Sequence, residues 1–339
     1  MDQWVGRKDF SSPPSLHYAN SRSMIAMAEK IDHEPLLADF TTISGARLRL
    51  GEPLARYTSM KIGGPADYFI DIDNDVALAE VFIALRRHQV PLWILGNGSN
   101  VLISDRGVRG AVIHLAGEFK KIVWHEIGDS IEAVVGAAYA VTQLVRQAAR
   151  KGCAGLEFAE GIPGSVGGAL VMNAGAYGSE FEKVVERVEG INHAGQGVVF
   201  SKQEMTFSYR DSHLPADTVV TRVWLRLRRQ DAALVDSKLR ELVIKRKSSQ
   251  PSGFPNSGSM FRNPPGDYAG RLIEAAGLKG HRIGQAQIAE RHANFIVNLG
   301  GARAADVRQL MQAAQGEVRR RFNIDLVPEV KFVGEWPND

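Results

Sequence analysis

Apolar and polar positions follow two regular spacings along most of this chain. Apolar residues recur at helical spacing over residues 76–88, directly after Asp75, which predicts a helix with Asp75 at its N-cap. Strong alternation over residues 219–227 predicts a half-buried strand. The same reasoning predicts further helices at 141–151, 233–247, 268–276 and 304–322, and strands at 67–72, 92–95, 101–103, 111–115, 122–124, 131–135, 184–191, 197–200, 293–299 and 326–333.

These elements predict an α+β protein of several parts. Residues 1–45 show little periodicity, so we expect a partly disordered leader with a short helix near residues 25–28. Residues 46–117 and 118–231 each read as a small α+β unit, and residues 232–333 read as a third unit of different character.

Two glycine-rich runs stand between buried-looking segments. The first glycine loop, GNGSN at residues 96–100, has apolar runs on both sides, which predicts the order strand, tight loop, strand. Such a loop can bind an anion through backbone N–H groups arranged as a concave nest. The second glycine loop, GIPGSVGG at residues 161–168, offers the matching half of such a site. Together the two loops favour a dinucleotide ligand.

Three sets of polar residues stand in unusual places. Arg210 in SYRDS is either half of a surface Arg–Asp pair or part of an anion site, for which a guanidinium fork suits a carboxylate. Ser259 belongs to a segment, 255–264, that reads equally well as a plain turn or as a site. Glu329 lies in an apolar stretch. Its carboxylate is either exposed at a sheet edge and paired with Lys331, or buried with a role in catalysis.

Composition excludes several classes of function. The chain has 339 residues, of which 44% are hydrophobic, and 41 basic against 38 acidic side chains give a net charge of +3. This charge is too small to indicate a nucleic-acid surface, and charges interrupt every apolar run, so we expect no membrane insertion. The lone Cys153 excludes an intrachain disulfide and a cysteine metal cage, and we expect it to be a small buried hydrophobe. No secretory signal pattern begins the chain, so we expect a cytoplasmic protein.

Motifs for hydrolases and metal centres are absent from the sequence. It contains no G-x-S-x-G elbow and no H-x-x-x-H pair, so we expect no metal site, and His281 and His292 read as polar contacts.

Seven stretches resemble one family closely and in the family's order. They are YTSMKIGGPA at 57–66, GNGSN at 96–100, GIPGSVGG at 161–168, NAGAYG at 173–178, SYRDS at 208–212, GSMFRNP at 258–264 and PEV at 328–330. The set resembles UDP-N-acetylenolpyruvoylglucosamine reductases, in the subclass that lacks a long tyrosine-bearing flap. The resemblance runs from about residue 56 to 333 and leaves out the first 45 residues.

The resemblance implies the fold, the cofactor and the reaction. It implies an FAD-binding domain of the vanillyl-alcohol-oxidase type, made of two α+β halves, followed by an α+β substrate-binding domain. FAD would be bound noncovalently, because nothing matches a flavin-linking His or Cys. NADPH would be the co-substrate, UDP-N-acetylglucosamine enolpyruvate the substrate, and UDP-N-acetylmuramate, a peptidoglycan precursor, the product. We expect a monomer.

The resemblance also assigns roles to individual residues. Arg210 and Glu329 match the residues that stabilise a doubly anionic intermediate, and Ser259 matches the proton donor. The implied cofactor-binding residues are Tyr57, Lys61, Gly63, Gly96, Asn97, Gly98, Ser99, Asn100, Gly161, Ile162, Pro163, Gly164, Ser165, Gly167, Asn173, Gly175 and Ala176. The implied substrate-binding residues are Tyr209, Asn263, His292 and Lys331, although the family commonly has Arg at the position of Lys331.

Two other functions remain open from the residues. One is an oxidase on the same flavin fold, which would need a base that oxidises an alcohol and often a covalent flavin. The other is a nucleotide-sugar binder without catalysis, against which the joint presence of Arg210, Ser259 and Glu329 speaks.

Overall fold

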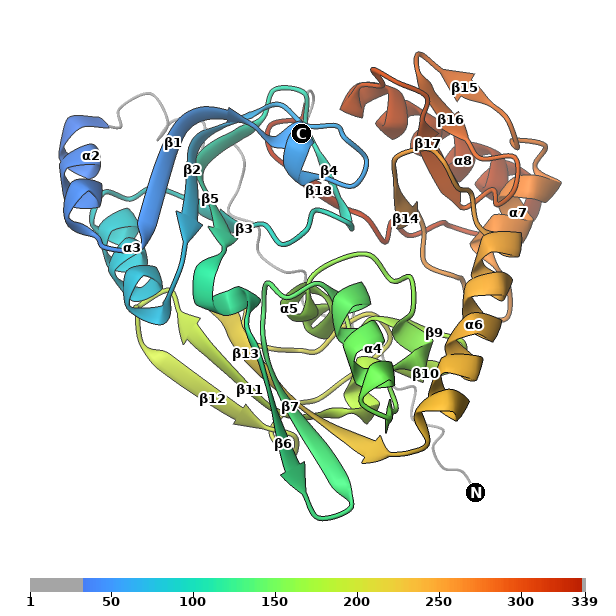
Figure 1. Cartoon of the computed structure of the whole chain (residues 1–339). Coiled ribbons are helices and arrows are strands. Elements are labelled where there is room, and N and C mark those ends of the chain that lie inside the picture. Colours follow the sequence, from blue (N-terminus) through green and yellow to red (C-terminus); the bar gives the residue numbers. More distant parts are fainter. Residues whose placement is uncertain (1–32, 337–339) are drawn as a thin grey trace, which may run out of the picture.

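The computed structural model describes residues 33–336, which form three α+β parts (Figure 1). The first part is a four-stranded sheet in the order β1-β2-β5-β3, with helices beside it. Its elements are α2 (His33–Thr42), β1 (Ala46–Pro53), η1 (Leu54–Tyr57), β2 (Pro65–Ile72), α3 (Asp75–Arg87), β3 (Leu92–Ile94), β4 (Val101–Ile103), β5 (Val108–Leu115) and η2 (Gly117–Lys120).

Helix α3 shows how local sequence sets an element. Its apolar stripe, including Leu78, Val81 and Leu85, is buried against the sheet, as the helical spacing predicted. The expected N-cap was wrong by one residue. Asn74, in extended conformation, accepts a hydrogen bond from Ala77 N at 2.9 Å, and Asp75 is the first residue of the helix.

The second part contains the longest strand and the largest sheet. Its main path is β12-β11-β13-β7-β6, and β8 pairs with the end of β13. Its elements are β6 (Ile122–Ile127), β7 (Ser130–Gly136), α4 (Val141–Arg150), β8 (Cys153–Ala154), η3 (Glu157–Ala159), α5 (Val166–Val171), β9 (Gly175–Ala176), β10 (Ser179–Glu180), η4 (Phe181–Lys183), β11 (Val185–Asn192), β12 (Gly197–Ser201) and β13 (Thr218–Arg229). Cys153 is buried, as expected.

The third part is a small sheet, β14-β17-β16-β15, with two helices against it. Its elements are β14 (Asn256–Ser259), α7 (Ala269–Ala275), β15 (Arg282–Ile283), β16 (Ala286–Ile288), β17 (Phe295–Asn298), α8 (Ala304–Phe322) and β18 (Lys331–Val333). The stripe of α8 that includes Val307, Leu310 and Val318 is buried, as the sequence predicted.

Two differences from the expected organisation concern where segments pack. Residues 33–42 of the expected leader form helix α2, and Leu36 and Phe40 join the core shared by the first two parts. The short helix expected near residues 25–28 lies outside the described residues. Helix α6 (Ala232–Ser249), expected to open the third domain, buries Val235 and Leu239 in that same shared core and leads up to the third part (Figure 1).

The end of the chain ties the third part to the first. Strand β18 pairs in parallel with β4, so Lys331 lies opposite Val101. The strand expected over residues 326–333 is only three residues long, because residues 327–329 bond to residues 260–262 instead of continuing along β4. Residues 326–330 are irregular, with one bridge between Pro328 and Phe261. This arrangement carries Glu329 into the region between the parts.

Candidate active site

The two glycine loops, from different parts of the molecule, lie against each other. The hydroxyl of Ser99 donates a hydrogen bond to the carbonyl oxygen of Pro163 at 3.0 Å. A Cβ atom added to Gly96 would lie 2.7 Å from Ser165 Oγ, and one added to Gly164 would lie 2.8 Å from Ser99 Oγ. Because real Cβ contacts are longer, a larger residue at either position would force the facing serine side chain to move.

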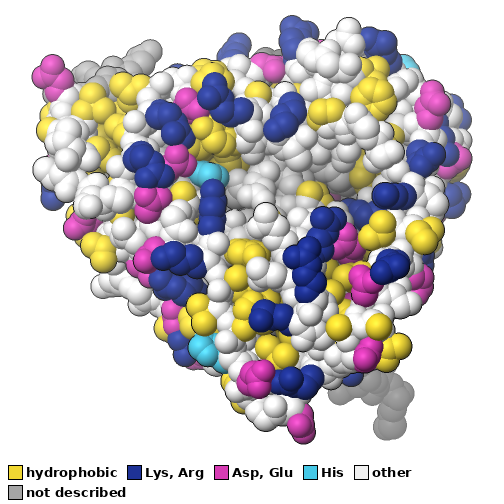
Figure 2. All heavy atoms as spheres, viewed as in Figure 1, with side chains coloured by type: hydrophobic (Ala, Val, Ile, Leu, Met, Phe, Trp, Pro, Cys, Tyr) yellow, Lys and Arg dark blue, Asp and Glu magenta, His cyan; other side chains and the backbone are white. Residues whose placement is uncertain are grey.

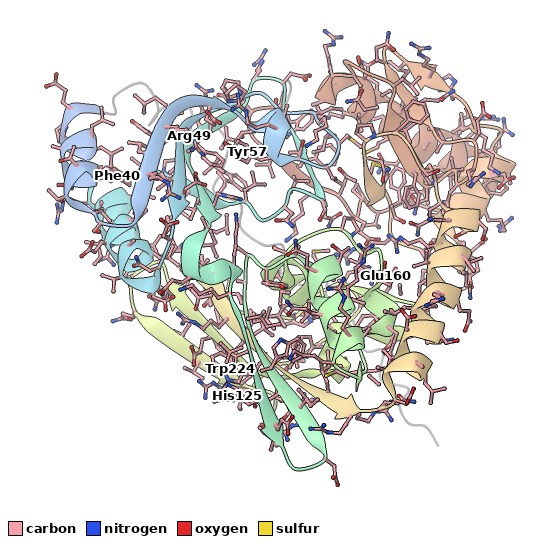
Figure 3. All side chains as sticks on the ribbon, viewed as in Figure 1. Phe40, Arg49, Tyr57, His125, Glu160 and Trp224 are labelled. Atoms are coloured by element: carbon pink, nitrogen blue, oxygen red, sulfur yellow. The ribbon has the colours of Figure 1, made fainter. Side chains whose placement is uncertain are left out.

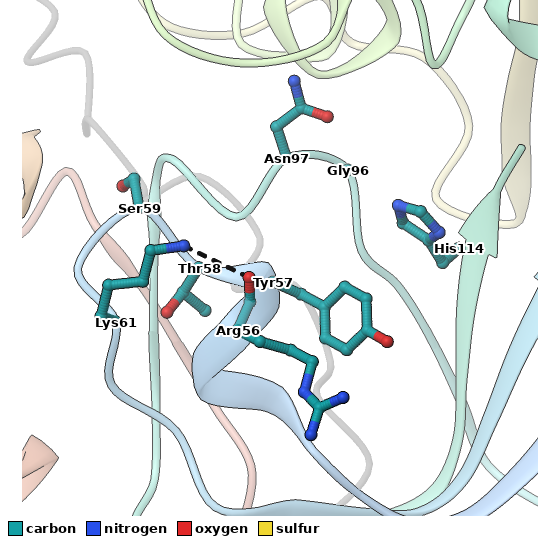
Figure 4. Close-up of a pocket in the computed structure, with 8 residues that line it drawn as sticks. All are labelled: Arg56, Tyr57, Thr58, Ser59, Lys61, Gly96, Asn97 and His114. Atoms are coloured by element: carbon teal, nitrogen blue, oxygen red, sulfur yellow. Dashed lines mark hydrogen bonds between the residues drawn. The ribbon is translucent and has the colours of Figure 1, made fainter.

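A pocket of about 260 Å³ opens beside the first glycine loop. Its lining residues are Arg56, Tyr57, Thr58, Ser59, Lys61, Gly96, Asn97 and His114 (Figure 4). Two of them are cations, and Lys61 Nζ donates to the carbonyl oxygen of Arg56 at 3.3 Å. The surface is hollowed near the middle of the face shown in Figure 2, with Lys and Arg side chains around the hollow. A pocket with cations beside a glycine loop suits an anionic group such as a diphosphate.

Tyr57 is fixed by contacts on several sides. Its ring stacks on Phe69 with centroids 4.3 Å apart, and its hydroxyl donates to Glu52 Oε1 at 2.7 Å. Arg49 Nη2 donates to the same hydroxyl at 3.1 Å, so the two side chains lie together on the first sheet (Figure 3). Burial, followed by the bond to Glu52, raises the pKa of Tyr57, which keeps the phenol neutral.

Three charged or titratable groups beside this pocket escaped the sequence analysis. Asp71 accepts from Arg49 at 2.8 Å and contacts His114 Nδ1 at 2.6 Å. Burial raises the pKa of Asp71, but the bonds from His114 and Arg49 outweigh it and hold that pKa below its usual range. The available signal was polar Asp71 and His114 inside otherwise apolar strands.

Arg210 and Glu329, 119 positions apart, form an ion pair. Arg210 Nε donates to Glu329 Oε1 at 2.9 Å, and Arg210 Nη2 donates to the carbonyl oxygen of Gly175 at 3.3 Å. The guanidinium also lies over the Tyr209 ring, 4.9 Å from its centroid. Arg210 has a φ of +63°, a left-handed conformation that is uncommon outside glycine and often marks functional sites.

Glu329 is held by its main chain as well as by Arg210. Its N–H donates to the carbonyl oxygen of Met260 at 2.8 Å, and its own carbonyl accepts from Asn100 Nδ2 at 3.2 Å. Burial raises the pKa of the Glu329 carboxyl, while the charge and hydrogen bond of Arg210 and the charge of Arg262 oppose the shift. The net result is a pKa above the usual value, which favours the neutral acid.

Ser259 is the last residue of β14, opposite Phe295, and directly precedes Met260. The Met260 bond to Glu329 therefore brings the Ser259 segment beside the Arg210–Glu329 pair. Asn100, assigned to the cofactor by resemblance, donates a hydrogen bond from its side-chain amide to the Glu329 carbonyl oxygen. The first glycine loop is thus connected directly to the main chain of Glu329.

Other residues assigned to the cofactor contribute through packing and turns. Gly63 has a φ of +144°, and a Cβ there would lie 3.1 Å from Ile103. Asn173 is fully buried, and its amide donates to Glu180 and to the Ser208 carbonyl at 2.8 and 3.1 Å. Asn173 thereby anchors the turn that carries Arg210. The remaining members of this set lie in the two loops or, for Gly175 and Ala176, in β9.

The residues assigned to substrate binding are less closely gathered. Tyr209 lies at the pair described above. Asn263 Oδ1 accepts from Ala269 N at 3.1 Å, and His292 packs edge-on against Phe295, with centroids 4.9 Å apart. Both contacts remain within the third part. Lys331 is exposed on β18.

A membrane-spanning helix and a metal-binding cluster are both absent from residues 33–336. No helix there is long and apolar enough to cross a membrane, and no group of His, Cys, Asp and Glu side chains could hold a metal ion.

Comparison with known proteins identifies the family. Residues 66–201 match the FAD binding domain model, and residues 250–333 match the C-terminal domain model of UDP-N-acetylenolpyruvoylglucosamine reductase. A Symbiobacterium thermophilum protein named UDP-N-acetylenolpyruvoylglucosamine reductase 2 is 45% identical over 86% of this chain and 94% of its own length. The chain belongs to the UDP-N-acetylenolpyruvoylglucosamine reductase family.

Further relatives agree with membership in the reductase family. A reductase from Caldanaerobacter subterraneus is 44% identical over 85% of this chain and 94% of its own length. The crystal structure of the reductase from Thermus caldophilus matches with a TM-score of 0.72 and 39% identity, over 86% of this chain and 99% of that one. These comparisons confirm three predictions from the sequence: the family, the flavin-binding fold and the FAD cofactor.

Proposed function

We propose that this reductase converts UDP-N-acetylglucosamine enolpyruvate to UDP-N-acetylmuramate with NADPH, in peptidoglycan precursor synthesis, and that Arg210, Ser259 and Glu329 carry the chemistry. The family relationship over most of the chain supports the reaction. The single observation that supports the assignment of residues is the Arg210–Glu329 pair beside the Ser259 segment.

The glycine loops and the adjoining pocket are suited to hold FAD without a covalent bond. The loops lie against each other at Gly96 and Gly164, and the residues that line the pocket beside them include Arg56 and Lys61. FAD, when bound, supplies the hydride chemistry that connects NADPH with the enolpyruvyl double bond.

Arg210 and Glu329 act where negative charge develops. When the methylene carbon of the enolpyruvyl group gains a hydride, electrons move toward the substrate carboxylate, which becomes doubly anionic. A guanidinium fork and a neutral carboxyl can both donate hydrogen bonds to such oxygens. The raised pKa of Glu329 favours the neutral form that this role needs.

Ser259 is the proposed proton donor to the carbon next to the substrate carboxylate. Its hydroxyl is a weak acid, but the developing carbanion is a strong base. Ser259 stands at the end of a strand, and the bond from Glu329 N to Met260 fixes the next residue. Ser259 and Glu329 would thus face the same end of the substrate.

The two half-reactions test the proposal separately. Under anaerobic conditions NADPH should bleach the flavin absorption, and the enolpyruvyl substrate should restore it. Ser259→Ala should leave bleaching nearly unchanged and slow the restoration by about 10²–10⁴-fold, the usual contribution of proton transfer. Ser237→Ala, at an exposed position on α6, is the matched control. Unchanged restoration in Ser259→Ala would remove Ser259 from the mechanism.

The same assay addresses the other two functions. An oxidase would regain its flavin absorption with oxygen alone and would ignore the sugar substrate. A binder without catalysis would bind the sugar and leave the bleached flavin unchanged. The monomeric state and the cytoplasmic location remain predictions, which gel filtration and cell fractionation would check.

A further inference from the structure

Arg262 lies beside the Arg210–Glu329 pair, and the Nε of its side chain is buried. Its main-chain N–H donates to the carbonyl oxygen of Val327 at 2.9 Å, and the preceding residue Phe261 bridges Pro328. These contacts hold Arg262 against the segment that ends in Glu329. Its Nε is buried, yet it has no hydrogen-bond partner among the described residues. A buried donor without an acceptor is costly, so native proteins usually provide one.

The charges around Glu329 do not balance. Arg210 donates to its carboxylate directly, and the positive charge of Arg262 also acts on it and favours the ionised form. Lys331, a further cation two residues after Glu329, is exposed on β18. Two guanidinium groups therefore stand against one carboxylate, which leaves an excess positive charge in a partly buried site. Such a site attracts an anion.

We propose that Arg262 binds the carboxylate of the enolpyruvyl substrate, together with Arg210. This inference rests on the proposed function. Arg262 follows Ser259 by three residues in the same segment, and both belong to the neighbourhood of Glu329. The carbon that Ser259 would protonate carries the substrate carboxylate, so that anion lies closer to Arg262 than the diphosphate, which is separated by the sugar. The unpaired Nε would gain its acceptor from a carboxylate oxygen.

Two ligands, one with and one without the enolpyruvyl group that carries the carboxylate, test this role. UDP-N-acetylglucosamine shares the nucleotide, diphosphate and sugar with the substrate but has no enolpyruvyl group. Binding of each to the oxidised, FAD-loaded enzyme is measured by calorimetry. Arg262→Gln should weaken binding of the enolpyruvyl sugar by about 10- to 100-fold, the worth of one charge-assisted hydrogen bond. Binding of UDP-N-acetylglucosamine should change by less than about twofold.

Arg262→Lys provides a milder variant. It keeps the charge but loses the planar fork. It should therefore weaken binding of the enolpyruvyl sugar by about 3- to 10-fold and leave the affinity for UDP-N-acetylglucosamine unchanged. This variant decides the matter if Arg262→Gln fails to fold. Arg271→Gln, which removes an exposed arginine paired with Asp267 on the same part of the fold, is the control and should change neither affinity.

The outcomes separate the two proposals. If Arg262→Gln weakened binding of both ligands equally, Arg262 would contact the diphosphate and the inference would be overturned. Unchanged affinity for both ligands would also overturn it. Failure of the wild-type enzyme to restore its bleached flavin with the enolpyruvyl sugar would instead overturn the proposed function.

Discussion

Replacement of Gly96 by alanine tests the contact between the two glycine loops. Gly96 does not have a left-handed φ, so alanine meets no backbone strain there. Among residues 33–336, and apart from the two chain neighbours of Gly96, the heavy atoms within 4 Å of the added methyl group would be Ser165 Oγ at 2.7 Å and Ser165 Cβ at 3.8 Å. Within the protein itself, the cost of Gly96→Ala therefore depends on how Ser165 responds.

The hydroxyl of Ser165 can escape by rotation, but it is already engaged. Ser165 is the N-cap of α5, and its Oγ accepts from Gly168 N at 3.3 Å. Loss of an N-cap bond costs about 1 kcal/mol, within a range of roughly 0.5–2 kcal/mol. Gly96→Ala and Ser165→Ala should therefore each destabilise the protein by about 1 kcal/mol, for the same physical reason.

The double variant makes the prediction sharp. With alanine at both positions the cap is lost only once, and the new methyl group lies 3.8 Å from Cβ of residue 165, an ordinary contact. The pair should cost about 1 kcal/mol instead of about 2 kcal/mol, a coupling typical of residues in contact. Urea unfolding of the holoenzyme at a fixed excess of FAD measures each value. Additive losses would refute the loop contact. Gly197→Ala, with nothing within 4 Å, is the control and should change stability by less than about 0.5 kcal/mol.

Three further predictions concern single side chains. Because burial raises the pKa of Glu329 and its neutral form is the proposed donor, the rate of flavin restoration by substrate should be constant at low pH and fall as pH rises through that pKa; Glu329→Gln should be about 10²-fold slower and lose this alkaline limb in stopped-flow traces. Asn100→Ala frees the Glu329 carbonyl, so it should slow restoration about tenfold while bleaching by NADPH changes little, and equal effects on both steps would contradict a positioning role. The bond from Arg271 lowers the pKa of Asp267 from 3.8 to about 2, so its stabilising effect is complete above the usual pKa and disappears as pH falls through about 2; melting temperatures of Asp267→Asn against pH should lack this acid limb.

Sequence spacing predicted the elements that are stabilised by one face of their own residues. Helix α8 was expected at 304–322 and has these bounds, because its stripe and its left-handed C-cap, Asn323, are both local features. The N-cap of α3 was missed by one residue, since Asn74 and Asp75 can both accept the capping bond. Only the backbone conformation decides between them, and side-chain type does not report it.

The candidate site was harder to predict because its contacts cross the chain. The alternation around Glu329 suggested a continuous strand, but residues 327–329 bond to residues 260–262, and only residues 331–333 pair with β4. Nothing local to Glu329 indicated Arg210, since the pair is 119 residues apart. The family resemblance selected both residues without showing that they touch. Arg262 stood in a recognised motif, yet its missing partner is visible only in three dimensions.

Glu329 receives one contact from each part of the molecule, and this explains why its position requires the complete fold. Asn100 from the first part bonds its carbonyl, Arg210 from the second bonds its carboxylate, and Met260 from the third accepts its N–H. Each bond contributes only about 0.5–3 kcal/mol, but together they fix both the main chain and the side chain. A shift of any one part relative to the others would break one of these three bonds and so displace Glu329. The proposed catalytic position of Glu329 is therefore formed only when the first glycine loop, the Arg210 turn and the Ser259 segment are packed together.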